Sequence, residues 1–127
     1  MGNVFIDVLC VLLFLVVSSR GVSVHECNPF LSITQELTGF QIHGQPEWNV
    51  TVTNLCACFQ QQVQITCPGI GNSTLALDAK IIAQSGNDIC TLNGSLFIQP
   101  HSSVSFKYAW QEINFQPFDS SEACSIH

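Results

Sequence analysis

Hydrophobic and polar residues alternate along much of this chain, as expected of β-strands that bury one face. The alternation is strictest in 48–54 and 104–110. One face of these segments carries apolar side chains, namely Trp48, Val50, Val52, Val104, Phe106, Tyr108 and Trp110. The opposite face carries Asn49, Thr51, Thr53, Ser103, Ser105, Lys107 and Ala109. Both segments are therefore predicted to be strands that pack their apolar face into a core.

Shorter alternating runs predict further strands. They cover 31–37, which Thr38-Gly39 breaks, 63–67, which Pro68-Gly69 ends, and 89–92 and 96–98. Asn93-Gly94 suits a type I′ turn, so the last two runs are predicted to form a hairpin. Residues 59–62 are predicted to turn the chain between 48–54 and 63–67, and 76–83 is the one segment with a helical pattern.

Five or more short strands separated by Gly, Pro and Asn turns, in about a hundred residues, favour one architecture. We expect an all-β fold, an antiparallel β-sandwich stapled by three disulfides.

The N-terminal segment has the features of a signal peptide. Residues 8–17 form an apolar run that is too short for the roughly twenty residues of a membrane span. Small residues suit cleavage after Gly21 or Ser23. We therefore expect a signal peptide over 1–23 and a single secreted cysteine-rich β domain over 24–127. The alternative is a buried N-terminal helix of the domain.

The cysteine content is high for a chain of this length. The chain has seven cysteines, and Cys10 would leave with the signal peptide. An even count in a short secreted domain predicts three disulfides, with fifteen possible pairings. The six remaining cysteines are Cys27, Cys56, Cys58, Cys67, Cys90 and Cys124. Cys56 and Cys58 are poor partners for each other, because such a close bridge in extended chain is strained. The competing hypothesis is a zinc site built from Cys56, Cys58, Cys67 and a histidine.

Charge and sequons agree with an extracellular domain. The net charge of −6 makes nucleic acid and anionic membranes poor partners. The N-glycosylation motif occurs three times, at Asn49, Asn72 and Asn93. Asn72 and Asn93 stand in turn-like sequence, whereas Asn49 lies in a predicted strand and must face outward to be modified.

The sequence offers little catalytic chemistry, and we expect no enzyme, no catalytic residues, no cofactor and no bound metal. His43 and His101 fall in predicted turns, and His25 and His127 lie near the termini. Nucleophile-elbow, zinc-protease and phosphate-loop motifs are absent from the sequence. Glu47 and Asp119 are the candidates for a carboxylate pair of the glycosidase kind.

Aromatic residues leave a second binding hypothesis open. Trp48, Tyr108 and Trp110 could stack on sugar rings if their strand face were exposed. They share that face with Val and Phe, which favours core packing. The alternative function is thus a cell-wall carbohydrate-binding module without catalysis.

Several motifs together resemble one family of proteins. They are Pro46-Glu-Trp48, Cys56-x-Cys58, the later Cys67 and Cys90, Tyr108-Ala-Trp110 and the terminal Cys124-Ser125. In this order they resemble the plant tapetum-determinant family of small secreted proteins, from Cys27 to Cys124.

The resemblance implies a ligand. Members of the family look like apoplastic signals for a leucine-rich-repeat receptor kinase in cell-fate specification of the anther tapetum. It implies that the six cysteines are the structural framework, and it assigns no catalytic residue. The partner expected from it is the receptor ectodomain, and the sequence does not name the receptor-contacting residues.

Overall fold

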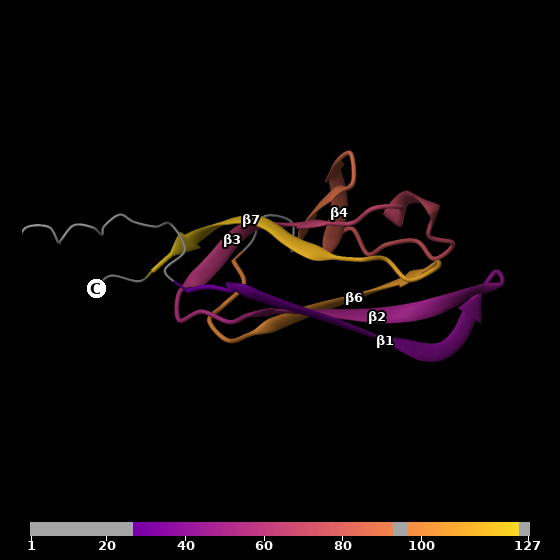
Figure 1. Cartoon of the computed structure of the whole chain (residues 1–127), viewed down its shortest axis with the longest axis horizontal. Coiled ribbons are helices and arrows are strands. Elements are labelled where there is room, and N and C mark those ends of the chain that lie inside the picture. Colours follow the sequence, from indigo (N-terminus) through magenta and orange to yellow (C-terminus); the bar gives the residue numbers. More distant parts are fainter. Residues whose placement is uncertain (1–26, 93–96, 125–127) are drawn as a thin grey trace, which may run out of the picture.

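The structure is a computed structural model that describes residues 27–92 and 97–124. Within them the chain forms two antiparallel sheets, which are stacked as two layers in Figure 1. One sheet has the order β1 (Leu31–Ile42), β2 (Gln45–Asn54), β6 (Ser103–Ala109). The other has the order β4 (Ile82–Gly86), β5 (Ile89–Leu92), β3 (Phe59–Thr66), β7 (Gln116–Ala123). The expected antiparallel β-sandwich is confirmed.

The three-stranded sheet follows the alternation of its sequence. Val50 and Val52 of β2 are fully buried, as is Tyr108 of the neighbouring β6. The opposite face is covered with hydroxyl and other polar side chains, and the Thr53 and Ser103 hydroxyls are 2.7 Å apart. Ala109 departs from the prediction, because it is buried rather than exposed. Residues 73–74 cover it and hydrogen-bond its backbone.

The four-stranded sheet corrects one predicted turn. Residues 59–62 do not join two paired strands, because they form the first half of β3. β3 lies in the other sheet from β2, so residues 55–58 carry the chain from one layer to the other. β3 then ends at Thr66, beside the predicted stop at Pro68-Gly69. The segment joins β3 because Phe59, Gln60 and Gln61 pair with β7, and the register shifts after Gln61.

Two further expectations are wrong. Residues 76–83 form no helix, and the chain there runs irregularly into β4, which makes a hairpin with β5 around 87–88. The described part of the run 96–98, Phe97 and Ile98, does not pair with β5, whose neighbours are β4 and β3, and Ile98 instead bridges Gln60. The Asn93-Gly94 turn lies outside the described residues. Pairing of β4 with β5 decides the first outcome and the bridge from Ile98 to β3 the second, and neither is visible locally in the sequence.

Two polar side chains are fully buried between the layers, Asn54 and Gln60. The Asn54 side-chain N–H groups donate to the backbone oxygens of Cys58 (2.8 Å), Ile98 (3.0 Å) and Gln99 (3.2 Å). Its side-chain oxygen accepts from the N–H of Cys56 at 2.9 Å. Asn54 therefore joins the end of β2 to two segments that connect the sheets.

The three disulfides are present, and they pair Cys27 with Cys56, Cys58 with Cys124, and Cys67 with Cys90. The first two join the described ends of the chain to the segment between β2 and β3. The third links the end of β3 to β5 inside the core, where both cysteines are fully buried. All six cysteines are thus taken up by disulfides, which leaves none for the competing zinc site.

Tyr108 lies at the centre of a polar network inside the core. Its hydroxyl donates to Oε1 of Gln35 (2.6 Å) and accepts from the N–H of Ile113 (3.0 Å). Burial raises the pKa of this hydroxyl, the hydrogen bond from the Ile113 N–H opposes that rise in part, and the charge of Glu112 adds a smaller rise. The protonated phenol is thus the form that the fold stabilises.

We expect Tyr108→Phe to lower the free energy of unfolding by about 1–3 kcal/mol, because the buried Ile113 N–H loses its acceptor. Urea unfolding measures the loss. Since the raised pKa means that the folded state holds this proton more tightly, the stabilisation is complete below about pH 10 and declines above it. Tyr108 is the single tyrosine of the chain, so ultraviolet titration reports its phenolate alone. A phenolate transition at the ordinary pKa in the folded protein would contradict this account.

Candidate functional site

The β1–β2 hairpin ends in a tight two-residue turn. His43 and Gly44 both have positive φ, 51° and 83°, as a type I′ turn requires. The turn joins Ile42 to its partner Gln45. His43 is exposed here, and His101 is exposed in a second turn, as expected of both, whereas His25 and His127 lie outside the described residues.

β1 carries a bulge just before this turn. Leu37 pairs with Trp48 and Gln41 pairs with Pro46, so three residues of β1 oppose Glu47 alone. Thr38-Gly39 was expected to break the strand, but the strand continues through the bulge to Ile42. We call Leu37–Phe40 the apolar bulge, because Leu37 is 57 % and Phe40 69 % exposed.

Hydrogen bonds fix the conformation of the apolar bulge. The Thr38 hydroxyl donates to Oε1 of Glu47 at 2.7 Å and accepts from the N–H of Phe40 at 3.3 Å. Gly39 between them has a φ of 96°, which favours glycine. Glu47 is itself 93 % buried, since its exposed fraction is 7 %. The two exposed apolar side chains are thus held on an ordered backbone, which lowers the entropy cost of binding through them.

The exposure of Leu37 follows from its place in the sheet. Leu37, Trp48 and Tyr108 form one row across the inner face of β1, β2 and β6. The Trp48 and Tyr108 rings are stacked with their centroids 6.4 Å apart. Tyr108 is fully buried, Trp48 is half-buried and Leu37 is exposed, so the buried fraction of the side chains in this row decreases from β6 to β1. Apolar surface is left open at the hairpin end of the sandwich.

The three candidate rings for sugar stacking do not form an exposed row. Tyr108 is fully buried, and Trp48 and Trp110 are half-buried. The indole N–H of Trp48 donates to the backbone oxygen of Trp110 at 3.1 Å, which ties these residues to the framework. The expected core packing is confirmed, and the aromatic sugar platform has no surface among the described residues.

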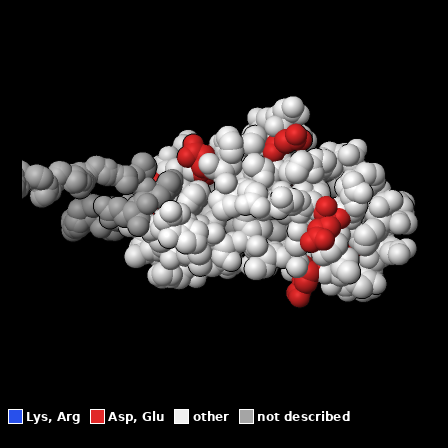
Figure 2. All heavy atoms as spheres, in the orientation of Figure 1, with Lys and Arg blue, Asp and Glu red and all other residues white. Residues whose placement is uncertain are grey.

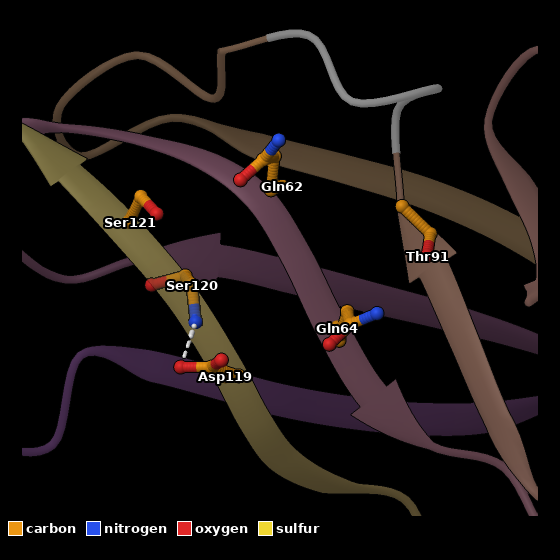
Figure 3. Close-up of a pocket in the computed structure, with 6 residues that line it drawn as sticks. All are labelled: Gln62, Gln64, Thr91, Asp119, Ser120 and Ser121. Carbon is orange, nitrogen blue, oxygen red and sulfur yellow. Dashed lines mark hydrogen bonds between the residues drawn. The ribbon is translucent and has the colours of Figure 1, made fainter. Parts of the chain in front are cut away.

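A polar groove lies on the outer face of the four-stranded sheet (Figure 3). It has a volume of about 290 Å³ and is lined by Gln62, Gln64, Thr91, Asp119, Ser120 and Ser121. Asp119 accepts a hydrogen bond from the N–H of Ser120 at 2.9 Å, drawn as a dashed line in Figure 3. The groove offers amides, hydroxyls and one carboxylate but no aromatic ring, so it lacks the stacking surface that the carbohydrate hypothesis needs.

The two candidate carboxylates are not brought together. Glu47 is buried in the three-stranded sheet against Thr38, whereas Asp119 lines the polar groove on the other sheet. Residues 27–92 and 97–124 contain no group of three or more His, Cys, Asp or Glu that could hold a metal ion. Within the same residues, no helix has the length and hydrophobicity to cross a membrane.

The sequons differ in their placement. Asn49 is half-exposed on the outer face of β2, as the parity of the strand predicted. Asn72 is exposed at the end of a short 3-10 helix, Ile70–Asn72. Asn93 lies outside the described residues. Glycosylation of all three asparagines remains a prediction.

Acidic side chains are dispersed over the surface. Figure 2 shows them as separate groups on one face, with no Lys or Arg in view. No single patch dominates that face, so its electrostatic contribution to binding would be general attraction to a basic partner.

Comparison with known proteins identifies the family. The family model described as tapetum determinant 1, C-terminal, matches residues 27–125. The chain belongs to the tapetum determinant 1 family. The matched region includes all six disulfide-bonded cysteines, so the family's sequence pattern coincides with the framework of this sandwich. No curated protein and no solved structure gave a significant match.

The apolar bulge was not predicted from the sequence. The signal for it was Gly39 between Thr38 and Phe40, directly after a regular alternation. Glycine inside a strand pattern often marks a bulge. Its place opposite Glu47 became visible only with the pairing of β1 and β2.

Proposed function

We propose that this protein is a secreted signalling ligand, bound in the apoplast by the ectodomain of a leucine-rich-repeat receptor kinase. The process would be cell-fate specification of the anther or tapetum type. The observation that carries the proposal is the family match over residues 27–125. Three disulfides in a small domain are typical of proteins that mature in an oxidising compartment, which supports secretion.

The apolar bulge is the surface that we propose for the receptor contact. Leu37 and Phe40 are large, exposed and held by the Thr38–Glu47 hydrogen bond. Apolar side chains of this kind, presented on an ordered backbone, are suited to act as binding anchors. A ligand needs no reacting group, because it acts by binding one receptor state better than another.

The test is a titration of the oxidised protein against the ectodomain of the family's leucine-rich-repeat receptor kinase. We expect saturable binding at micromolar affinity or tighter. The double variant Leu37→Ala/Phe40→Ala should bind about 30-fold more weakly or worse, because truncating anchors costs about 2 kcal/mol or more.

Phe118→Ala is the matched control for this titration. Phe118 is 56 % exposed but lies on β7 of the other sheet. Its truncation should change the affinity less than twofold, and circular dichroism should show that both variants are folded. Undiminished binding of the double variant would exclude the apolar bulge as the contact, and absence of any binding would contradict the proposed receptor.

A further inference from the structure

Among the described residues, β6 is an edge of the three-stranded sheet, because β2 is its sole neighbour there. The backbone oxygen of Ser102 accepts a bond from β2 at 2.9 Å, and the N–H of Trp110 donates to β2 at 3.2 Å. In an antiparallel pair, alternate residues direct their backbone groups toward the partner strand. The backbone groups of Ser105 and Lys107 therefore point away from β2, toward the open edge.

At one position of this edge, another segment of the chain already hydrogen-bonds to the backbone of β6. The N–H of Ala109 donates to the Ser73 hydroxyl at 3.0 Å, and its oxygen accepts from the N–H of Thr74 at 2.9 Å. Residues 73–74 thus act as a short fragment of a fourth strand. The pairing stops there, because no hydrogen bond outside the β2–β6 ladder engages the backbone of Ser105 or Lys107 within the part of the chain that the structure describes.

A hollow continues from this point along the same edge. It has a volume of about 310 Å³, and β6 contributes Ser105, Phe106 and Lys107 to its lining. The facing wall is the segment after Thr74, which contributes the apolar side chains Leu75, Ala76 and Ile81. The hollow therefore combines unpaired backbone groups of a strand with an apolar wall, which are the requirements for adding an extended peptide to a sheet.

Charge indicates which peptide suits the hollow. The whole chain has three basic residues and a net charge of −6. Lys107 lines the hollow on the β6 side, whereas Asp78 lines it on the facing segment, two residues before Lys80. Lys107 is thus the charged residue on β6 itself, and the residue of an added strand directly opposite it is best acidic.

We propose that the open edge of β6 binds an extended acidic segment of a partner protein, which pairs with Ser105 and Lys107 as a fourth strand of the sheet. Side chains of the added strand alternate between the two faces of the sheet. Those on the outer face lie beside Lys107 and should be acidic. Those on the inner side lie toward Phe106 and Ile81 and should be apolar. The proposal does not depend on which receptor the protein binds.

The test uses the hexapeptide acetyl-Thr-Val-Glu-Val-Thr-Val-amide and the secreted, oxidised protein in isothermal titration. We expect a Kd on the order of 100 μM. Lys107→Glu should weaken binding of this peptide about tenfold or more. A peptide with Lys in place of Glu should instead bind Lys107→Glu more tightly than it binds the parent protein. Two alternately N-methylated peptides separate strand pairing from side-chain contact, because only the set whose amides face β6 should lose binding.

Ser105→Pro is the second variant. Proline is tolerated on an edge strand where the N–H faces outward, and here it removes that donor and blocks pairing. We expect this variant to remain folded and to lose peptide binding. Lack of binding up to about 1 mM peptide, or undiminished binding to Ser105→Pro, overturns the proposal.

Two other occupants of the edge are separated by the same set of measurements. Asn49 also lines the hollow, so a glycan on it could fill the space. Peptide binding that is confined to Asn49→Gln, and absent from the glycosylated protein, would assign the hollow to the sugar and overturn the proposal. A dimer in sedimentation that Ser105→Pro dissociates would assign the edge to a second copy, with the same result.

Discussion

Replacing Asn54 with alanine is expected to lower the free energy of unfolding by about 3–5 kcal/mol. The fully buried Asn54 side chain makes four hydrogen bonds, and its loss leaves one N–H and three backbone oxygens without this partner. A buried polar group that loses its partner costs about 1–3 kcal/mol. The loss should fall on the contact between the two layers, because the bonded segments connect the sheets.

Urea unfolding followed by tryptophan fluorescence measures this loss. Asn114→Ala is the matched control, because Asn114 is exposed and its side chain makes a single bond to Gln116. Its substitution should cost less than about 0.5 kcal/mol. Similar losses in the two variants would show that the buried network of Asn54 contributes nothing special to stability.

The position of Asn54 was open to prediction from sequence, but its role was not. It follows Val50 and Val52 at the next inward position of the strand, so alternation alone places a polar side chain in the core. Its acceptors include Ile98 and Gln99, which are more than forty residues away in sequence. Periodicity reports which face a side chain occupies and carries no information on such distant partners.

The same limit explains which strands were found. β2 and β6 alternate strictly because one face of each packs on the core. β7 was missed because most of its residues are exposed and its polar sequence, with Pro117, has no period of two. β7 is held by its pairing with β3 instead. Segments stabilised mainly by a neighbouring strand have little local signal.

The cysteine framework was predictable in number but not in pairing. A disulfide between Cys56 and Cys58 was disfavoured because it would be strained. In the structure Cys56 pairs with Cys27 and Cys58 pairs with Cys124, near opposite ends of the described chain. No feature of the spacing selects that arrangement from the alternatives. It depends on residues 55–58 crossing between the layers next to both ends of the described chain.

The fold separates stabilising features from the surfaces proposed for binding. The register of β1 with β2 places Leu31 opposite Asn54 at the disulfide end and Ile42 opposite Gln45 at the hairpin end. Two disulfides therefore secure one end of the three-stranded sheet, and the apolar bulge lies near the other. Substitutions that affect stability at the disulfide end should leave the geometry of the bulge intact as long as the domain is folded.

Removing the Cys58–Cys124 disulfide gives the cleanest test of this framework, with an expected loss of about 4 kcal/mol in the free energy of unfolding. The bridge closes a loop of 66 residues, the longest of the three, and the entropy that it removes from the unfolded chain grows with loop length. Cys58 is half-buried and Cys124 is exposed, so Cys58→Ser/Cys124→Ser buries little new polar surface. The fully buried Cys67 and Cys90 would mix packing losses into the same measurement.

Stabilisation through the unfolded chain predicts a second property of the variant without the Cys58–Cys124 disulfide. If the bridge acts on the unfolded state, its removal lets the denatured chain expand, and the dependence of the unfolding free energy on urea should become steeper. Receptor binding by the folded variant should stay within twofold of the parent, because the apolar bulge lies near the other end of the sheet. A loss of stability with an unchanged urea dependence would place the effect of this disulfide in the folded sandwich instead.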